Sequence, residues 1–185
     1  MKVRALAFSA FLLVSVSLFG QENESNEAIK YSNITEFGFF ATSPRSFGFE
    51  ATTVNGFSID QKHCLGIGLG FGTILGISED YFSVYMPITV NYRFYFSPKN
   101  SFSPHLNAAL GGVMVTEGIG IYSAVTMGFR AKRFSFSSGF SFMAIESELE
   151  EYVSGYNEWG NYGYYKSVKK WVYPFGIVLK VGFTF

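Results

Sequence analysis

The chain has 185 residues, which suits a single domain. Charged residues make up 15% and aromatic residues 19% of the sequence, whereas a typical soluble protein is roughly 25% charged. A soluble domain with this composition would expose large apolar patches, and a formal net charge of zero gives no support for a nucleic-acid partner.

The first twenty residues have the pattern of a secretory signal peptide. Lys2 and Arg4 precede an apolar run over residues 5–18, and cleavage is predicted after Gly20. The alternative, a membrane-anchoring helix, needs about 20 apolar residues, and this run is shorter. We therefore predict an exported protein with a signal peptide at 1–20 and a flexible, polar periplasmic leader at 21–32.

Residues 33–185 are predicted to form one all-β domain. Eight segments alternate between apolar residues and small or polar ones, as a strand does when its two faces meet different surroundings. They cover residues 33–41, 47–59, 65–72, 81–96, 102–115, 119–130, 134–143 and 175–185. An even number of such strands, each with one apolar face, predicts an eight-stranded antiparallel up-and-down transmembrane β-barrel.

The inward face carries the charged residues of these strands. They are Glu36, Glu50, Arg93, Arg130 and Lys180. Unpaired charges inside a barrel would be costly, so we predict salt bridges across the lumen, with Lys180 meeting an acid on the first or second strand. A lumen filled by such side chains is one interpretation, and a path for protons or ions is the other.

The connections fall into two classes. Short polar turns at 60–63, 97–100 and 131–133 share one end with both termini, and the opposite end carries the long connection at 147–170. Outer-membrane barrels have short periplasmic turns and longer external loops, so the termini are predicted on the periplasmic side.

Three stretches resemble small bacterial outer-membrane β-barrel-domain proteins of the eight-stranded type. They are Val181-Gly182-Phe183-Thr184-Phe185, which is similar to the carboxy-terminal signal of such barrels, the run from Met86 to Phe96, and the glycine-alternating run from Leu65 to Gly72. The resemblance covers about residues 33–185, which is essentially the whole predicted mature chain. It implies an integral protein of the outer membrane of a Gram-negative bacterium, with outer-membrane lipids as surroundings and the outer-membrane assembly machinery as a partner that reads Phe185.

The residues give no support for catalysis or for a bound cofactor. The two histidines, His63 in a predicted turn and His105 inside the barrel, lack the neighbours that a hydrolase would need. Cys64 is the only cysteine, and its neighbour His63 points to the other strand face, which disfavours a metal site. We therefore expect no enzyme activity, cofactor or metal.

The long connection is the best candidate for a functional segment. Its candidate binding residues are Tyr156, Trp159, Tyr162, Tyr164 and Tyr165. Tyrosine, tryptophan, asparagine and glycine provide contact area and adaptable hydrogen bonds in binding loops. The alternative is a pair of strands that extends past the membrane. We predict a structural or surface-interaction barrel that acts on a surface ligand through external loops. A narrow channel or transporter for small solutes is the alternative function.

Overall fold

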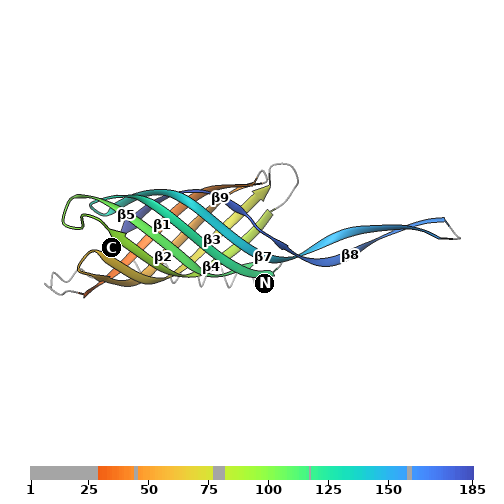
Figure 1. Ribbon diagram of the computed structural model, residues 1–185, viewed down its shortest axis with the longest axis horizontal. Helices are drawn as coiled ribbons and strands as arrows, with labels where there is room; N and C mark the ends of the chain where they lie inside the picture. Colours follow the sequence, from red (N-terminus) through yellow and green to blue (C-terminus); the bar gives the residue numbers. More distant parts are fainter. Residues whose placement is uncertain (1–28, 44–45, 77–81, 117, 158–159) are drawn as a thin grey trace, which may run out of the picture.

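A computed structural model describes residues 29–43, 46–76, 82–116, 118–157 and 160–185. The predicted signal peptide and most of the leader lie outside these residues. Within them the chain is a β-barrel with a long hairpin at one end (Figure 1). No helix in the described part of the chain is long and apolar enough to cross a membrane.

The strands are all antiparallel to their neighbours. Their bounds are β1 Ile29–Ser43, β2 Ser46–Ile59, β3 His63–Gly76, β4 Phe82–Tyr95, β5 Phe102–Val115, β6 Gly118–Ala131, β7 Phe134–Asn157, β8 Gly160–Val172 and β9 Phe175–Thr184. Consecutive strands pair from β1 to β7, and β9 pairs with both β7 and β1. These eight strands close the ring, because β8 pairs only with the outer part of β7. Closure leaves no sheet edge in the barrel wall.

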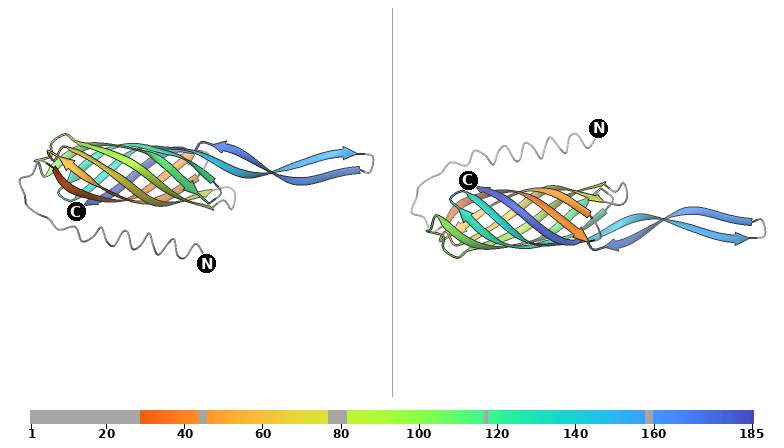
Figure 2. Two further views of the ribbon diagram at one scale, coloured as in Figure 1. Left: turned by 90° about the horizontal axis from the view of Figure 1, so that it is seen from below. Right: turned by 90° about the horizontal axis from the view of Figure 1, so that it is seen from above.

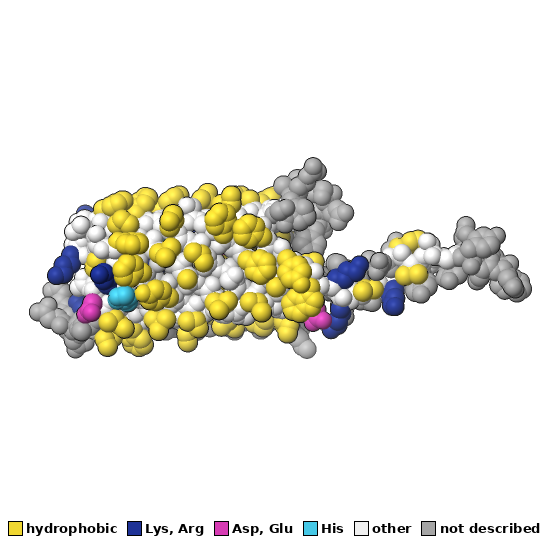
Figure 3. Space-filling model, in the orientation of Figure 1, with side chains coloured by type: hydrophobic (Ala, Val, Ile, Leu, Met, Phe, Trp, Pro, Cys, Tyr) yellow, Lys and Arg dark blue, Asp and Glu magenta, His cyan; other side chains and the backbone are white. Residues whose placement is uncertain are grey.

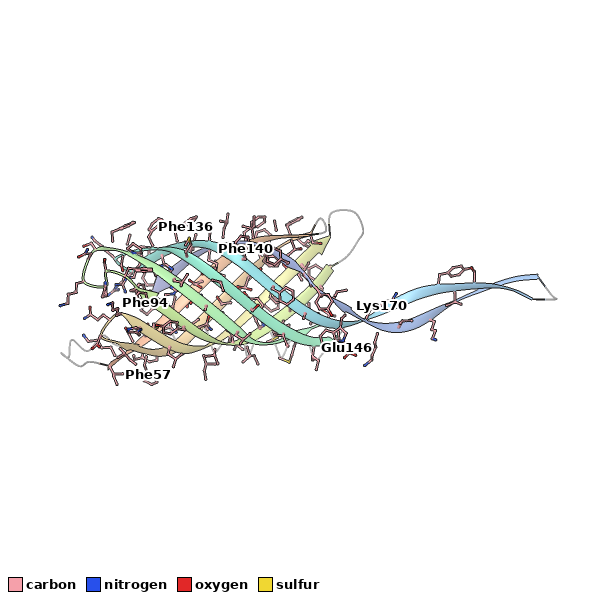
Figure 4. The ribbon with its side chains drawn as sticks, in the orientation of Figure 1. Phe57, Phe94, Phe136, Phe140, Glu146 and Lys170 are labelled. Carbon is pink, nitrogen blue, oxygen red and sulfur yellow. The ribbon has the colours of Figure 1, made fainter. Side chains whose placement is uncertain are left out.

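The predicted facing of the strands is confirmed. Along β4 the inward residues Ser83, Tyr85 and Arg93 are buried, while the outward Phe82, Ile88 and Val90 are exposed. Figure 3 shows apolar side chains over the visible side of the barrel, with charged ones at its ends. In Figure 4 the labelled rings of Phe57, Phe136 and Phe140 project from the wall. Large apolar side chains outside a closed, hydrogen-bonded cylinder identify a transmembrane β-barrel.

Several strand bounds differ from the prediction, and those of β1 and β3 move residues that were predicted to lie in the leader or a turn into the barrel wall. β1 begins at Ile29, so the last four residues of the predicted leader belong to the barrel. The reason is that Ile29 and Tyr31 continue the outward apolar alternation and pair with Ile59 and Phe57. His63 is the first residue of β3 rather than a turn residue, and its ring accepts or donates a hydrogen bond of 2.8 Å with the Tyr92 hydroxyl.

The interior is less polar than the sequence suggested. A buried apolar cluster fills the lumen towards the hairpin end and includes Phe40, Ile74, Val113 and Met143. The inward glycines of β3 make room for large neighbours, as expected. Gly72 is the clearest case, because a Cβ atom there would collide with the ring of Tyr85 on β4.

The ends of the barrel differ as predicted. β2 and β3 are joined by a tight turn in which Asp60 and Gln61 have φ of 51° and 57°, and Lys132 with φ 56° occupies the β6–β7 turn. The last strand finishes at this same end, where Thr184 N–H donates to the Arg133 carbonyl at 2.8 Å. The two views of Figure 2 place the hairpin at the opposite end, which is therefore the external one.

Candidate functional site

The lumen is crossed by a layer of four hydrogen-bonded side chains, which we call the outer polar layer: Glu50, Tyr85, Tyr122 and Lys180. The Glu50 carboxylate accepts from Lys180 Nζ at 2.7 Å, Tyr85 Oη at 2.9 Å and Tyr122 Oη at 3.3 Å. The four residues come from β2, β4, β6 and β9, which are alternate strands around the ring. The layer therefore joins all sides of the wall and occupies the middle of the lumen.

Gly38 explains how Lys180 and Glu50 meet. It pairs directly with Glu50 on β2 and with Lys180 on β9, and all three residues face inward. Because Gly38 has no side chain, the aliphatic part of Lys180 can lie over it. The nearest atoms to a Cβ placed on Gly38 would be Lys180 Cγ at 3.4 Å and a β9 carbonyl oxygen at 3.6 Å. The acid that Lys180 contacts is thus fixed by strand register.

A second ion pair lies closer to the periplasmic end. Arg93 Nη2 on β4 donates to Glu36 Oε1 on β1 at 2.5 Å, and both side chains are almost completely buried. Of the five charged residues predicted for the lumen, the structure brings four together in these two pairs. Arg130 stands apart at the periplasmic mouth, where it donates to the Pro98 carbonyl at 3.0 Å and lies 4.3 Å from the centre of the Tyr95 ring.

The predicted external loop is strand rather than loop over most of its length. β7 continues far beyond the barrel and pairs with β8 from Ile145 opposite Val172 to Asn157 opposite Gly160. We call residues 146–157 and 160–171 the external ribbon. At roughly 3.3 Å per residue its twelve pairs extend about 40 Å. Beyond Ser147, the described residues of β7 pair with β8 alone.

The ribbon separates charge along its two strands. Its β7 strand carries Glu146, Glu148, Glu150 and Glu151, and its β8 strand carries Lys166, Lys169 and Lys170. The register sets Glu148 opposite Lys169, and Lys169 Nζ lies 4.0 Å from Glu146 Oε1. Figure 4 shows the labelled Glu146 and Lys170 at the base of the ribbon. An exposed pair such as Glu146–Lys169 contributes little stability.

The predicted binding residues occupy the far part of the ribbon. Backbone pairing places Tyr165 opposite Tyr152, Tyr164 opposite Val153, Tyr162 opposite Gly155, and Tyr156 opposite Asn161. Trp159 lies outside the described residues. Tyr152 is exposed, and its ring covers Gly163 on the facing strand, as an aromatic residue often covers a strand glycine.

The structure also reveals an outward polar cluster that the sequence analysis missed. It consists of Tyr31, Asn33, Thr35, Thr53 and Asn55 on β1 and β2. Asn55 Oδ1 accepts from Asn33 Nδ2 at 2.7 Å and from Tyr31 Oη at 2.6 Å, and the two threonine hydroxyls lie 3.3 Å apart. The signal was the set of polar residues in phase with outward Phe37 and Phe39, beside the seam that β1 forms with β9.

The remaining candidates for chemistry are isolated. His105 is buried in the lumen against the Tyr95 ring, 5.6 Å between ring centres, and Cys64 is a buried free thiol. Among the described residues, no three histidines, cysteines or carboxylates are grouped as a metal site would require.

No protein-family model matches the sequence, and no curated protein matches it. Among solved structures, the chain is similar to the N-terminal β-barrel domain of Pseudomonas aeruginosa OprF, with 11% identity, a TM-score of 0.46, and 83% of this chain and 97% of that chain covered. It is also similar to Neisserial surface protein A (NspA), with 12% identity, a TM-score of 0.46, and 88% and 100% covered.

Proposed function

We propose that this integral outer-membrane barrel is a plugged, non-catalytic scaffold that presents its external ribbon to a ligand at the cell surface. The observation that carries the proposal is the contrast between the two ends of the molecule. A rigid, side-chain-filled cylinder in the membrane continues into a paired ribbon about 40 Å long, at 3.3 Å per residue. A barrel that served only as a pore would not require such an extension.

The outer polar layer favours the interpretation that the lumen is plugged rather than a channel. Three donors from three strands converge on one carboxylate, and an apolar cluster with Phe40 and Met143 fills the lumen beside it. A hydrated solute would have to break these hydrogen bonds in a low-dielectric interior, where each is costly to lose. Eight-stranded barrels generally have interiors filled in this way.

Planar-bilayer recordings of the refolded protein test the plug. We expect no discrete openings for the natural sequence. Reproducible single-channel steps would refute the plugged lumen and support the narrow channel. The double variant Glu50→Ala/Lys180→Ala empties the middle of the layer, and openings in this variant alone would locate the plug at these two residues.

The composition of the ribbon supports a binding role. Its outer part is rich in tyrosine, glycine and asparagine, which give rigid contact area and adaptable hydrogen bonds at low cost in conformational entropy. The acidic and basic residues lie between its base and its middle, and the tyrosines of the candidate binding set lie farther out. A two-stranded ribbon is marginally stable by itself, and a bound partner would order it further.

A shortened barrel tests the ribbon. Ser147 is joined to Lys170 through an Asn-Gly turn, which removes the ribbon and keeps the pairing of β6 with β7. Intact cells that express either form are compared for cell–cell aggregation and for adhesion to an array of purified surface glycans and matrix proteins. We expect the shortened form to reach the outer membrane, with normal heat-modifiable mobility, and to lose adhesion. Equal adhesion of both forms would overturn the binding role.

We propose that Phe185 is read by the outer-membrane assembly machinery. Its amide donates to the Asn33 carbonyl at 2.9 Å and its ring packs 4.6 Å from that of Phe183, so it extends the closing strand at the periplasmic rim. Phe185→Ala should slow assembly in cells while the purified chain still refolds in detergent. Unchanged assembly in cells would argue against this role.

A further inference from the structure

The outward aromatic rim at the periplasmic end of the barrel is interrupted on β3. Outward phenylalanines line this rim on β4, β5, β6, β7 and β9, and they include Phe94, Phe102, Phe129, Phe134 and Phe183. Some of their rings touch, with centres 5.0 Å apart for Phe102 and Phe129 and 5.1 Å apart for Phe134 and Phe183. On β3 the residue paired with Phe94 is His63. A polar ring therefore lies where these other strands place phenylalanine.

His63 lies on the outer wall of the barrel rather than in the lumen. It shares its strand face with Leu65 and Ile67, which are 53% and 66% exposed. It is the first residue of β3 and the partner of Phe94, so it lies at the level of the aromatic rim. Such rims mark the interface between the membrane and water. His63 is therefore level with lipid headgroups, and the apolar residues that follow on its face are level with acyl chains.

The lysine before His63 lies against the same wall. Lys62 Nζ is 5.6 Å from the centre of the Phe94 ring, and the centre of the His63 ring is 5.2 Å from it. Phe94 lies at this end of the barrel, so both groups flank one ring of the rim (Figure 4). Among the described residues, no carboxylate forms a salt bridge with Lys62. An ammonium held on apolar surface at the membrane interface attracts a lipid phosphate.

The His63–Tyr92 pair keeps one hydrogen to donate. His63 Nδ1 and Tyr92 Oη are 2.8 Å apart. If the hydroxyl donates to Nδ1, the hydrogen of a neutral imidazole is on Nε2, and if Nδ1 donates, the hydroxyl hydrogen is available. In both cases the pair offers one donor beside the Lys62 ammonium. The group that suits these donors is an anion that accepts several hydrogen bonds.

We propose that Lys62 and the His63–Tyr92 pair bind the phosphate of a membrane phospholipid whose acyl chains lie along the outward face of β3. Phosphate oxygens accept strong hydrogen bonds from an ammonium and can take the second donor as well. Asp60, exposed two residues before Lys62, disfavours a free phosphate dianion relative to the singly charged phosphodiester of a lipid. Figure 3 shows histidine, basic and acidic side chains together at this end of the wall. The site lies at the end opposite the external ribbon and does not depend on the proposed surface role.

The two histidines of the chain allow a direct test by NMR. The refolded mature chain in a maltoside detergent is titrated with dihexanoyl phosphatidylglycerol, and the imidazole resonances are followed. We expect a saturable shift of the His63 resonances, whereas those of His105, which is buried in the lumen, stay constant. Dihexanoylglycerol, which has the same chains without the phosphate, should cause no shift. Equal shifts of His63 with both lipids, or no shift with the phospholipid, would refute the site.

Substitutions test which groups bind the lipid. Lys62→Gln should weaken the apparent phospholipid affinity about tenfold or more, as expected for a lost hydrogen bond to a charged group. Lys99→Gln removes an exposed charge from the next periplasmic turn and is the matched control, with unchanged affinity. His63→Phe continues the phenylalanine rim and should retain fewer phospholipids than the natural sequence in native mass spectrometry. Equal affinities of Lys62→Gln and Lys99→Gln would contradict the proposal. Saturation of His63 by inorganic phosphate at the same concentration as by the phospholipid would overturn the assignment to a lipid.

Discussion

Removing the charge of Glu50 should destabilise the barrel more than removing the charge of Lys180. In Glu50→Gln the Lys180 ammonium, only 5% exposed, loses its carboxylate and keeps no other acid within bonding distance among the described residues. Breaking a buried ion pair in this way costs about 3–5 kcal/mol. In Lys180→Met the carboxylate still accepts from Tyr85 at 2.9 Å and Tyr122 at 3.3 Å.

The difference between the two variants can be estimated from these contacts. A hydrogen bond to a charged group contributes about 1.5–3 kcal/mol, so Lys180→Met should cost less than Glu50→Gln by at least about 1.5 kcal/mol. The double variant Glu50→Gln/Lys180→Met leaves no charge in the layer. It should be more stable than Glu50→Gln alone, because no unpaired ammonium remains.

Urea unfolding in phospholipid vesicles measures these free energies. Tryptophan fluorescence reports the transition, with Trp171 at the outer rim as one probe, and heat-modifiable gel mobility confirms the folded form. A greater loss in Lys180→Met than in Glu50→Gln would refute the assigned geometry. A double variant whose loss equals the sum of the two single losses would also refute it, because the residues would then be uncoupled.

The other predictions concern the outer face and the packing of the wall. Leu179→Arg places a charge towards lipid and should cost about 2–4 kcal/mol near the midplane, whereas Tyr173→Arg at the outer interface should cost about 0–1 kcal/mol, both measured by the same urea titration. Gly72→Ala should cost about 1–3 kcal/mol through overpacking, whereas Gly112→Ala, which meets no atom closer than 3.9 Å, should be neutral; equal effects would contradict the packing. Asn33→Ala should cost about 1–3 kcal/mol by stranding its hydrogen-bond partners, and an unchanged urea midpoint would show that the outward polar cluster adds no stability.

The fold was predictable because its signal is local. In β4 the alternation of Ile88 and Val90 with Thr89 and Asn91 indicates which face meets lipid, and this facing follows from neighbouring residues alone. The closure of the ring then follows from the need to pair every backbone group in lipid. Strand starts were harder, because Ile29 and Tyr31 lie within a polar stretch and their outward facing depends on pairing with β2.

The site was only partly predictable, because it depends on register between distant strands. The sequence indicated that Lys180 meets an acid on the first or second strand, but Glu36 and Glu50 both qualified. The choice of Glu50 requires the pairing of Gly38 with both partners. The sequence of residues 147–170 is compatible with either a binding loop or a pair of strands. The cross-strand pairing that decides between them joins residues as distant as Ile145 and Val172. The outward polar cluster was missed because positions in phase with outward Phe37 and Phe39 were expected to be apolar.

The outer polar layer also constrains how the barrel can fold. Lys180 and Glu50 are 130 residues apart, and Tyr122 is 72 residues from Glu50. Contacts of such separation form late, after the entropy of closing a long loop has been overcome. Until β9 joins β1, neither lysine nor carboxylate has its counterion, and an open sheet would present both to lipid. We expect the pairing of β9 with β1 and the burial of these charges to occur in one cooperative step. Barrels in which these two strands are not yet paired should therefore stay unpopulated in the membrane.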